Sequence, residues 1–354
     1  MLINILYFIL AMSILVLIHE FGHFIACKAF NVYTSEFSIG MGPKIFGKKF
    51  IETEFTIRAL PIGGFVAIAG DSENALESKV DKVIPFERTI KGIANWKKLI
   101  IMLAGVTMNF IFAIIIMAGI LMYSGNYVLD TQPIVADVLM DSPAYNAGLK
   151  ANDKIIKVEF EDGRIIKPKS FEDILSFTAG YANQITYTIE RKDAVKSFSM
   201  TPKFIEDGQY YSSGIMLPKR EVVDVTISNS LYYSCDYLIN LTKNTIISLG
   251  HMISGKGLEQ VSGPVGIFQV TAEAASLGLI TYINFIALLS LNLGIFNLLP
   301  LPILDGGRVV ITLVEMIIRK PVNEKIQNVM MSISMLLLLA LMIFVTFKDV
   351  MKLF

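Results

Sequence analysis

The stretch "VLIHEFGHFIAC", residues 16–27, decides how the rest of the chain is interpreted. His19, Glu20 and His23 form the pattern H-E-x-x-H, a signature of zinc peptidases. On a helix, two histidines four positions apart face the same way and can bind one metal ion, and the glutamate beside them can polarise a metal-bound water. Residues 2–18, which precede the motif, carry no charge. The sequence therefore predicts a metal site at the end of an apolar helix.

The composition is that of a membrane protein. Of the 354 residues, 53% are hydrophobic and 18% are charged, whereas about 25% are charged in an average soluble domain. Besides residues 2–18, three uncharged runs are each long enough to cross a bilayer, which takes about 20 residues. They cover residues 99–129, 274–304 and 326–347. We therefore expect a polytopic α-helical membrane protein with about four transmembrane helices.

The net charge and the N-terminal run exclude two other interpretations. The formal net charge is zero, so the chain lacks the basic footprint of a nucleic-acid-binding protein, and we expect no nucleic acid among its partners. The N-terminal run has no basic segment before it and no small-residue cleavage site after it, and it includes the H-E-x-x-H motif. We therefore interpret it as a retained span and not as a cleaved signal peptide.

The distribution of basic residues predicts the orientation in the membrane. Residues 1–27 hold no Lys or Arg, whereas residues 26–98 hold eleven. Basic residues next to spans prefer the cytoplasmic side. The N-terminus and the long segment at about 125–273 are therefore expected outside. The loop at 305–325, with four basic residues, is expected in the cytoplasm, on the same side as the end of the H-E-x-x-H helix.

A catalytic zinc ion takes three protein ligands and keeps one position open for water, so a third ligand is needed. In "NLLPLPILDGGR", residues 297–308, Asp305 is the first charge after an uncharged run, and a carboxylate at the margin of a span is usually functional. Pro300 and Pro302 break the helix there, and irregular backbone at membrane depth is tolerated only beside protein or a water-filled cavity. Asp305 therefore fits the third ligand. Taken alone, Asp305 also fits a helix N-cap or a positive-side anchor. The other histidine, His251, lies in the segment expected outside, so it is a poor candidate for the third ligand and fits a surface or interfacial role better.

These two motifs resemble those of the site-2 protease family of intramembrane zinc metalloproteases, and most closely its bacterial regulator-of-sigma-E protease group (RseP). "HEFGH" and "NLLPLPILDGG" are similar to the two metal motifs of the family. "FSIGMGPKIF" and "LPIGGFVAIAG" resemble its membrane-associated β-structure. "WKKLIIMLAGVTMNFIFA" resembles its second span, with Val106 where the family often has Pro, and "SGPVGIFQV" resembles the segment before its third span. The resemblance covers nearly the whole chain.

The resemblance implies roles for the residues of these motifs. They are the Zn2+ ligands His19, His23 and Asp305, the catalytic base Glu20, and Asn297 and Pro302 in substrate handling. The implied partners are the lipid bilayer and single-span membrane substrates, such as trimmed anti-sigma factors or remnant signal peptides. The implied location is the bacterial inner (cytoplasmic) membrane, where the protein would act in regulated intramembrane proteolysis with its active site toward the cytoplasm.

The segment between the first two spans has a strand-like pattern. Apolar and polar residues alternate in "KKFIETEFTI", which starts at Lys48. We expect several short strands, ended by a turn at Pro61, Gly63 and Gly64. They fit a plain cytoplasmic hairpin, but the family favours an edge strand that pairs with an unwound substrate, because β-addition supplies an extended substrate. Residues 71–88 are charged and irregular, and we expect a mobile loop there.

The outside segment resembles a PDZ domain in "VADVLMDSPAYNAGLKANDKIIKVEFEDG", residues 135–163. Only one such domain fits between Gly125 and Pro218, whereas some members of the group have two. Asn152 stands where glycine is usual, and Asn tolerates a left-handed turn. Residues 230–255 mix apolar and charged side chains, and they predict an interfacial amphipathic helix, with a fifth short span as the alternative.

Four parts are therefore predicted. Residues 1–124 form the first two spans with the H-E-x-x-H motif and a membrane-associated β-hairpin or sheet at 35–70, and residues 125–218 form an inserted α+β PDZ domain outside. Residues 219–273 form the interfacial helix region, and residues 274–354 form the third and fourth spans with the aspartate motif. The predicted function is an intramembrane zinc metalloendopeptidase. An inactive PDZ-containing scaffold is the main alternative, although such a scaffold would not need Glu20. A metal transporter is a third hypothesis, but it would spread its ligands across several depths of the membrane.

Overall fold

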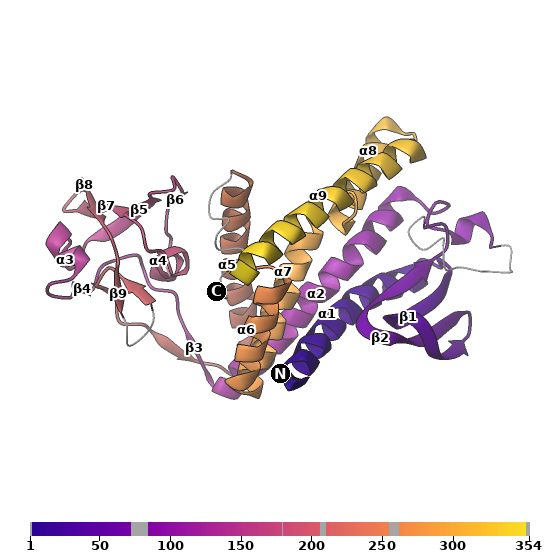
Figure 1. Cartoon of the computed structure of the whole chain (residues 1–354), viewed down its shortest axis with the longest axis horizontal. Helices are drawn as coiled ribbons and strands as arrows, with labels where there is room; N and C mark the ends of the chain where they lie inside the picture. Colours follow the sequence, from indigo (N-terminus) through magenta and orange to yellow (C-terminus); the bar gives the residue numbers. More distant parts are fainter. Residues whose placement is uncertain (1, 72–83, 179, 206–209, 255–261, 352–354) are drawn as a thin grey trace. The chain divides into compact units, whose positions relative to one another are not determined.

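The computed structural model describes residues 2–71, 84–178, 180–205, 210–254 and 262–351. The chain divides into two compact units. One unit contains residues 1–120 and 262–354, and the other contains residues 121–261. The first unit holds most of the long helices and a bent β-hairpin, and the second holds the remaining strands (Figure 1). Most of the loop expected at 71–88 lies outside the described residues, and its last part includes a short 3-10 helix, η1 (Phe86–Arg88).

Within the described residues, four helices are long and apolar enough to cross a membrane. They are α1 (Leu2–Ala29), α2 (Asn95–Ser124), α7 (Leu279–Asn297) and α9 (Glu324–Met351). Even α7, with 19 residues, is about 28 Å long at 1.5 Å per residue, close to the thickness of the hydrocarbon core of a bilayer. A helix satisfies its own backbone hydrogen bonds, which is what uncharged runs in lipid require. The expected polytopic helical membrane architecture is confirmed.

The first span packs against the third. Ala11 and Leu15 of α1 are buried against Tyr282 and Ile286 of α7. The hydroxyl of Tyr282 donates a hydrogen bond to the backbone carbonyl of Tyr7 at 2.7 Å. The α1 helix also contacts the short helix α6 (Pro264–Ser276), which lies beside it in Figure 1. These contacts hold α1 firmly against the segment that leads to Asp305.

A carboxylate at the end of α9 caps α6. Asp349 is buried, and its Oδ2 accepts hydrogen bonds from the backbone N–H groups of Gly263 at 2.7 Å and Gly266 at 2.9 Å. A negative charge at a helix N-terminus satisfies unpaired N–H groups and interacts favourably with the helix dipole. A Cβ on either glycine would lie 3.0–3.1 Å from the carboxylate oxygen. The motif "SGPVG" therefore places α6 on the last span.

The β-hairpin consists of β1 (Thr34–Phe50) and β2 (Thr53–Ile68), and both strands bend. The first part of β1 lies between the two ends of β2, so that Phe37 pairs with both Phe55 and Val66. Residues 64–68 of β2 therefore pair with the first part of β1. We expected the strands to end at Pro61–Gly64, and this expectation is wrong: β2 continues through these residues and bends, with Gly63 at φ +80°.

Glu52 ties the hairpin to its neighbours. It lies between the two strands and accepts hydrogen bonds from the side chains of Lys28, at the end of α1, and Arg88, in η1, each at 2.7 Å. Burial acts to raise the pKa of Glu52, but the two cations outweigh it and lower that pKa below its ordinary value. The hairpin is thereby fixed to the end of α1 that carries the H-E-x-x-H motif.

The second unit combines antiparallel strands with short helices. A four-stranded sheet has the order β6-β5-β7-β8, and three two-stranded pairs accompany it. The strands are β3 (Asn126–Val128), β4 (Asp137–Val138), β5 (Lys154–Phe160), β6 (Ile165–Ile166), β7 (Ile185–Arg191), β8 (Ala194–Met200), β9 (Lys203–Ile205), β10 (Tyr210–Ser212), β11 (Ile215–Met216) and β12 (Val222–Asp224). Helices α3 (Pro143–Ala147) and α4 (Phe171–Thr178) complete it, and its core includes Ile155, Val158 and Tyr187.

Two local expectations fall in this unit. Asn152 adopts the left-handed conformation expected of it, with φ 67°. Residues 230–255 were expected to form an amphipathic helix, and α5 (Ser230–Ile253) covers most of them. It is not among the four candidate spans of the described residues, and it exposes Leu231, Tyr232 and Ile239. Its place at the membrane interface stays a prediction.

Candidate metal centre

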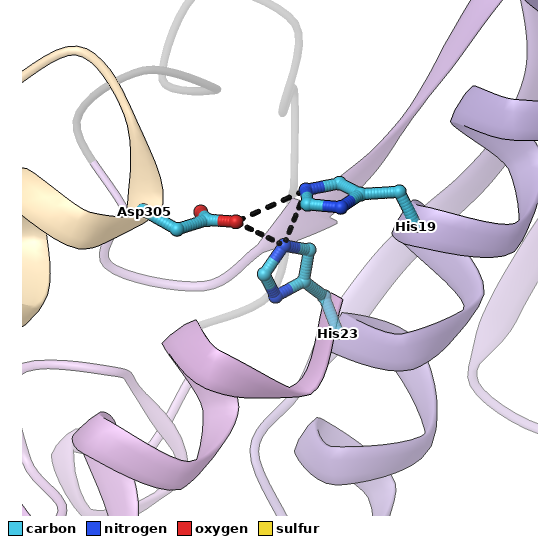
Figure 2. Close-up of side chains that lie close together, drawn as sticks. All are labelled: His19, His23 and Asp305. Carbon is cyan, nitrogen blue, oxygen red and sulfur yellow. Dashed lines mark hydrogen bonds and ion pairs between the residues drawn. The ribbon is translucent and has the colours of Figure 1, made fainter. Parts of the chain in front are cut away.

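His19 and His23 lie one helical turn apart on α1 and point to the same side (Figure 2). Both side chains are buried. Their Nε2 atoms are 3.2 Å apart, and their rings are nearly perpendicular, with centroids 4.8 Å apart. Two imidazole nitrogens thus converge on one point, as the i, i+4 spacing predicts.

Asp305 completes the cluster from a different part of the chain. The α7 helix ends at Asn297, the proline-containing segment turns the chain, and Asp305 begins α8 (Asp305–Ile318). Its Oδ2 lies 3.0 Å from His19 Nε2 and 3.4 Å from His23 Nε2 (Figure 2). One ligand atom from each of the three residues lies within 4.8 Å of the others.

Two glycines allow the turn that delivers Asp305. A Cβ on Gly306 would lie 2.3 Å from the backbone oxygen of Leu298, and one on Gly307 would lie 2.1 Å from that of Leu301. Real Cβ atoms do not approach so closely, so only glycine fits at either position. The residues after the aspartate in "LDGG" therefore fold the start of α8 back over the end of α7.

The backbone of α2 fixes the hydrogen position on His23. Its Nδ1 lies 2.8 Å from the carbonyl oxygen of Ile101. A carbonyl oxygen can only accept, so Nδ1 must carry a hydrogen, and in the neutral imidazole Nε2 then presents its lone pair to the cluster. A buried lone pair that faces a carboxylate oxygen is repulsive unless a cation lies between them. This geometry fits a metal ion.

The space for an ion depends on Gly105 of α2. A Cβ at this position would lie 2.4 Å from His23 Nε2 and 2.8 Å from His19 Cε1. The same helix approaches α1 closely at Gly22, where an added Cβ would lie 2.3 Å from the carbonyl oxygen of Ala104. The two spans therefore meet through small residues, and their closeness brings α2 directly to the two histidines. Histidine, histidine and aspartate are a suitable donor set for Zn2+.

Glu20 faces the same cavity as His19, His23 and Asp305. Its Oε2 accepts a hydrogen bond from the backbone N–H of Val66 at 3.1 Å. Val66 belongs to β2, so the hairpin contacts this carboxylate beside the cluster. Asn297 places its amide nitrogen 3.5 Å from His19 Nε2, and Pro302 lines the cavity as well. The structure thus brings all six predicted site residues to one place, and their roles remain predictions.

The cavity measures about 700 Å³ and extends well beyond the motifs. Phe65 and Val66 form part of its wall, as do Phe86 and residues at the beginning of α9. Arg308 of α8 pairs with Asp71 through two contacts of 3.0 and 3.1 Å on this wall. Sequence reasoning missed these wall residues, because they are separate in the chain and none belongs to a metal-binding motif.

Two residues of α2 were also missed. Gly105 makes room for the cluster, and Asn109 places its amide nitrogen 3.2 Å from His19 Nδ1. Both lie in the quoted stretch "WKKLIIMLAGVTMNFIFA". The sequence did offer a signal for Asn109: it is a polar amide in the middle of a long uncharged run. Such an amide is costly in a membrane unless it has a hydrogen-bond partner.

Known proteins resemble this chain along nearly its full length. The model of peptidase family M50 matches residues 7–341. A protein of Clostridium acetobutylicum is 37% identical over 348 residues, which cover 98% of this chain and 97% of that protein. A protein of Clostridium perfringens is 34% identical over 348 residues, 98% of each chain. Both are named "putative zinc metalloprotease".

A further relative has a more specific name. The regulator of sigma-W protease RasP of Bacillus subtilis is 28% identical over 421 aligned residues, which cover 98% of each chain. The family match spans far more than half of the chain, and the relatives align with it from end to end. The chain therefore belongs to peptidase family M50, the site-2 family of membrane-embedded, zinc-dependent metalloproteases.

Proposed function

We propose that the protein is an endopeptidase that cuts single-span membrane proteins within or beside the bilayer. The observation that supports this most is the cluster of His19, His23 and Asp305, buried beside Glu20 at the end of a membrane-spanning helix. A hydrolytic site belongs in a membrane when the bond to be cut is there. The cavity of about 700 Å³ gives water a route to it.

The residues of the cluster take distinct roles in this proposal. His19, His23 and Asp305 hold the zinc ion, which supplies Lewis-acid activation of a water molecule and of the scissile carbonyl. Glu20 takes the proton of the attacking water and gives it to the leaving amine. The N–H of Val66 holds the Glu20 carboxylate in place. Asn297 and Pro302, at the rim of the ligands, handle the substrate.

The hairpin of β1 and β2 is the proposed docking place for the substrate. Peptidases generally need an extended substrate, whereas a transmembrane helix has all its backbone groups paired. Adding the substrate as a strand to a sheet supplies the extended form. The hairpin reaches Glu20 through Val66, which supports a substrate strand bound near the catalytic cluster.

The proposed orientation places the active site toward the cytoplasm and the N-terminus outside. It is supported by the eleven basic residues between 26 and 98. Residues 125–218 then form a single extracytoplasmic PDZ domain, and α5 lies at the membrane interface. The location proposed is a bacterial inner membrane, and the substrate is a trimmed anti-sigma factor or a remnant signal peptide. The name of the RasP relative, regulator of sigma-W protease, supports a role beside sigma factors.

The proposal is tested with purified protein and a tagged single-span substrate. Cleavage should stop when a zinc chelator is added and return when Zn2+ is restored. The Glu20→Gln variant should bind zinc and leave the substrate intact. A protein that binds zinc and the substrate but cuts no single-span protein would favour the inactive scaffold.

A further inference from the structure

Asn109 is a fully buried amide in the middle of the second span. Its side-chain nitrogen lies 3.2 Å from His19 Nδ1, the ring nitrogen that does not face Asp305. Its side-chain oxygen is buried and has no hydrogen-bond partner among the described residues. A polar group at membrane depth is costly and marks a functional position.

The two histidines differ in the group that decides which ring nitrogen carries the hydrogen of the neutral imidazole. His23 Nδ1 faces the carbonyl of Ile101, which can only accept. His19 Nδ1 faces an amide, which can donate through its nitrogen or accept through its oxygen. If the amide donates, the hydrogen of His19 moves to Nε2 and occupies the lone pair that a metal needs. If the amide accepts, Nδ1 carries the hydrogen and Nε2 is free.

Within the part of the chain that the structure describes, the Asn109 side chain makes no hydrogen bond except the one to His19. Turning the amide by half a turn exchanges its oxygen and nitrogen without a change of shape. The oxygen gives up no hydrogen bond when it turns toward His19, because it has none among the described residues. The proposed role of His19 therefore sets the orientation of the Asn109 amide: Nε2 can bind a metal only if Nδ1 carries the hydrogen and the amide oxygen accepts it.

We propose that Asn109 is a positioning residue for the metal centre: its side-chain oxygen accepts the Nδ1–H of His19 and holds the tautomer whose Nε2 binds zinc. This inference rests on the proposed role of His19 as a ligand. It makes α2 the common support of the cluster, with the Ile101 carbonyl behind His23 and the Asn109 amide behind His19. Such outer hydrogen bonds fix ring orientation and ligand basicity.

Three full-length variants test the role of Asn109. Asn109→Leu is close in size and cannot accept a hydrogen bond. Asn109→Asp can accept from Nδ1–H and should rescue. Ser290→Ala is the matched control, because the buried Ser290 hydroxyl donates to the backbone carbonyl of Asn109 at 2.9 Å and touches neither histidine. The measurements are the affinity of the metal-free protein for Zn2+, by competition with a chromophoric chelator, and its thermal unfolding.

Asn109→Leu should weaken zinc binding by about 10- to 100-fold, the usual effect of losing an outer partner of a metal-bound histidine. Asn109→Asp and Ser290→Ala should stay within about threefold of the unaltered protein, even if their unfolding temperatures fall. Unaltered zinc affinity in Asn109→Leu overturns the inference. A folded Asn109→Asp whose zinc affinity falls by about tenfold or more overturns it too. This result is decisive even if Asn109→Leu does not fold.

His19→Ala separates this inference from the proposal beneath it. If His19→Ala loses zinc and Asn109→Leu does not, only the positioning role fails. If His19→Ala binds zinc like the unaltered protein, the ligand assignment itself fails.

Discussion

The backbone N–H of Val66 donates a hydrogen bond to the carboxylate of Glu20 at 3.1 Å. One partner lies in β2 of the bent hairpin, and the other lies between the two histidines in the sequence. The contact joins the hairpin that is proposed to bind an extended substrate to the group that is proposed to take a proton. Binding and chemistry are therefore linked through one hydrogen bond.

Replacing Glu20 with Gln should abolish cleavage without loss of zinc. Gln has almost the same shape and can still accept from Val66, but it cannot take a proton. Positioned acid–base catalysis contributes roughly 10²- to 10⁴-fold, so the rate should fall by about that factor. Cleavage assays alongside zinc analysis check it, with the exposed Glu87→Gln as control. A rate within a few-fold of the unaltered enzyme would remove Glu20 from the mechanism.

Replacing Asp305 with Ala should deplete the protein of zinc. The change removes one of three proposed ligands and leaves the two histidines without the carboxylate 3.0–3.4 Å away. The loss of affinity should exceed the 10- to 100-fold expected from an outer-shell change. Metal analysis after dialysis measures it, and Glu221→Ala, which alters an exposed carboxylate, is the control. Full zinc occupancy in Asp305→Ala contradicts the assignment.

Gly105→Ala should damage the metal centre although it adds one methyl group. The new Cβ would lie 2.4 Å from His23 Nε2, so the histidine must move or the two spans must separate. Gly119→Ala on the same helix is the matched control, because no atom lies within 4 Å of its added Cβ. Zinc affinity should fall at least about tenfold in the first variant, as for a displaced ligand. Equal affinities in both variants would show that the site has more room than the structure gives it.

The spans and the three residues that meet in the cluster could be predicted from the sequence because each depends on a local rule. Long uncharged runs must be helical in lipid, and Asp305 is conspicuous as a charge at the end of such a run. Gly105 and Asn109 were missed because their importance arises only when α2 packs on α1. The bend of β2 was missed because Pro61 and Gly63 indicate a turn locally, whereas pairing with β1 keeps the strand continuous.

The proposed orientation is tested by labelling single cysteines. Asn74, in the loop between the first two spans, is a suitable labelling position from the sequence, but it lies outside the described residues. The exposed Glu87, in η1 of the same segment, is therefore used as the labelling position. In a background of Cys27→Ala and Cys235→Ala, an impermeant thiol reagent should label Glu87→Cys only after cells are opened. Val195→Cys, exposed on β8, should be labelled in intact cells. The reverse pattern would invert the topology.

The last prediction concerns size selection by the proposed PDZ domain. A site within a membrane cannot easily admit a span that carries a large folded ectodomain. The second unit, Leu121–Val261, is joined to the first at both ends, near the end of α2 and before α6. Two tethers limit its reach, so the domain can act as a lid on the outer approach without binding a peptide. The alternative is a module that recruits substrates by their chain ends.

The lid and the recruiting module predict opposite changes in cleavage when the domain is deleted. Deleting residues 128–214 and bridging the gap with a flexible linker should, under the lid hypothesis, let the enzyme cut substrates with intact ectodomains. Under the recruitment hypothesis, the same deletion should slow cleavage of every substrate, trimmed or not. Zinc affinity of the deletion variant is the control for an intact membrane core, because the three ligand residues all lie in the first unit. With zinc binding preserved, an equal loss of cleavage on full-length and pre-trimmed substrates rejects the lid, since removing a lid can only widen the range of substrates that reach the cluster.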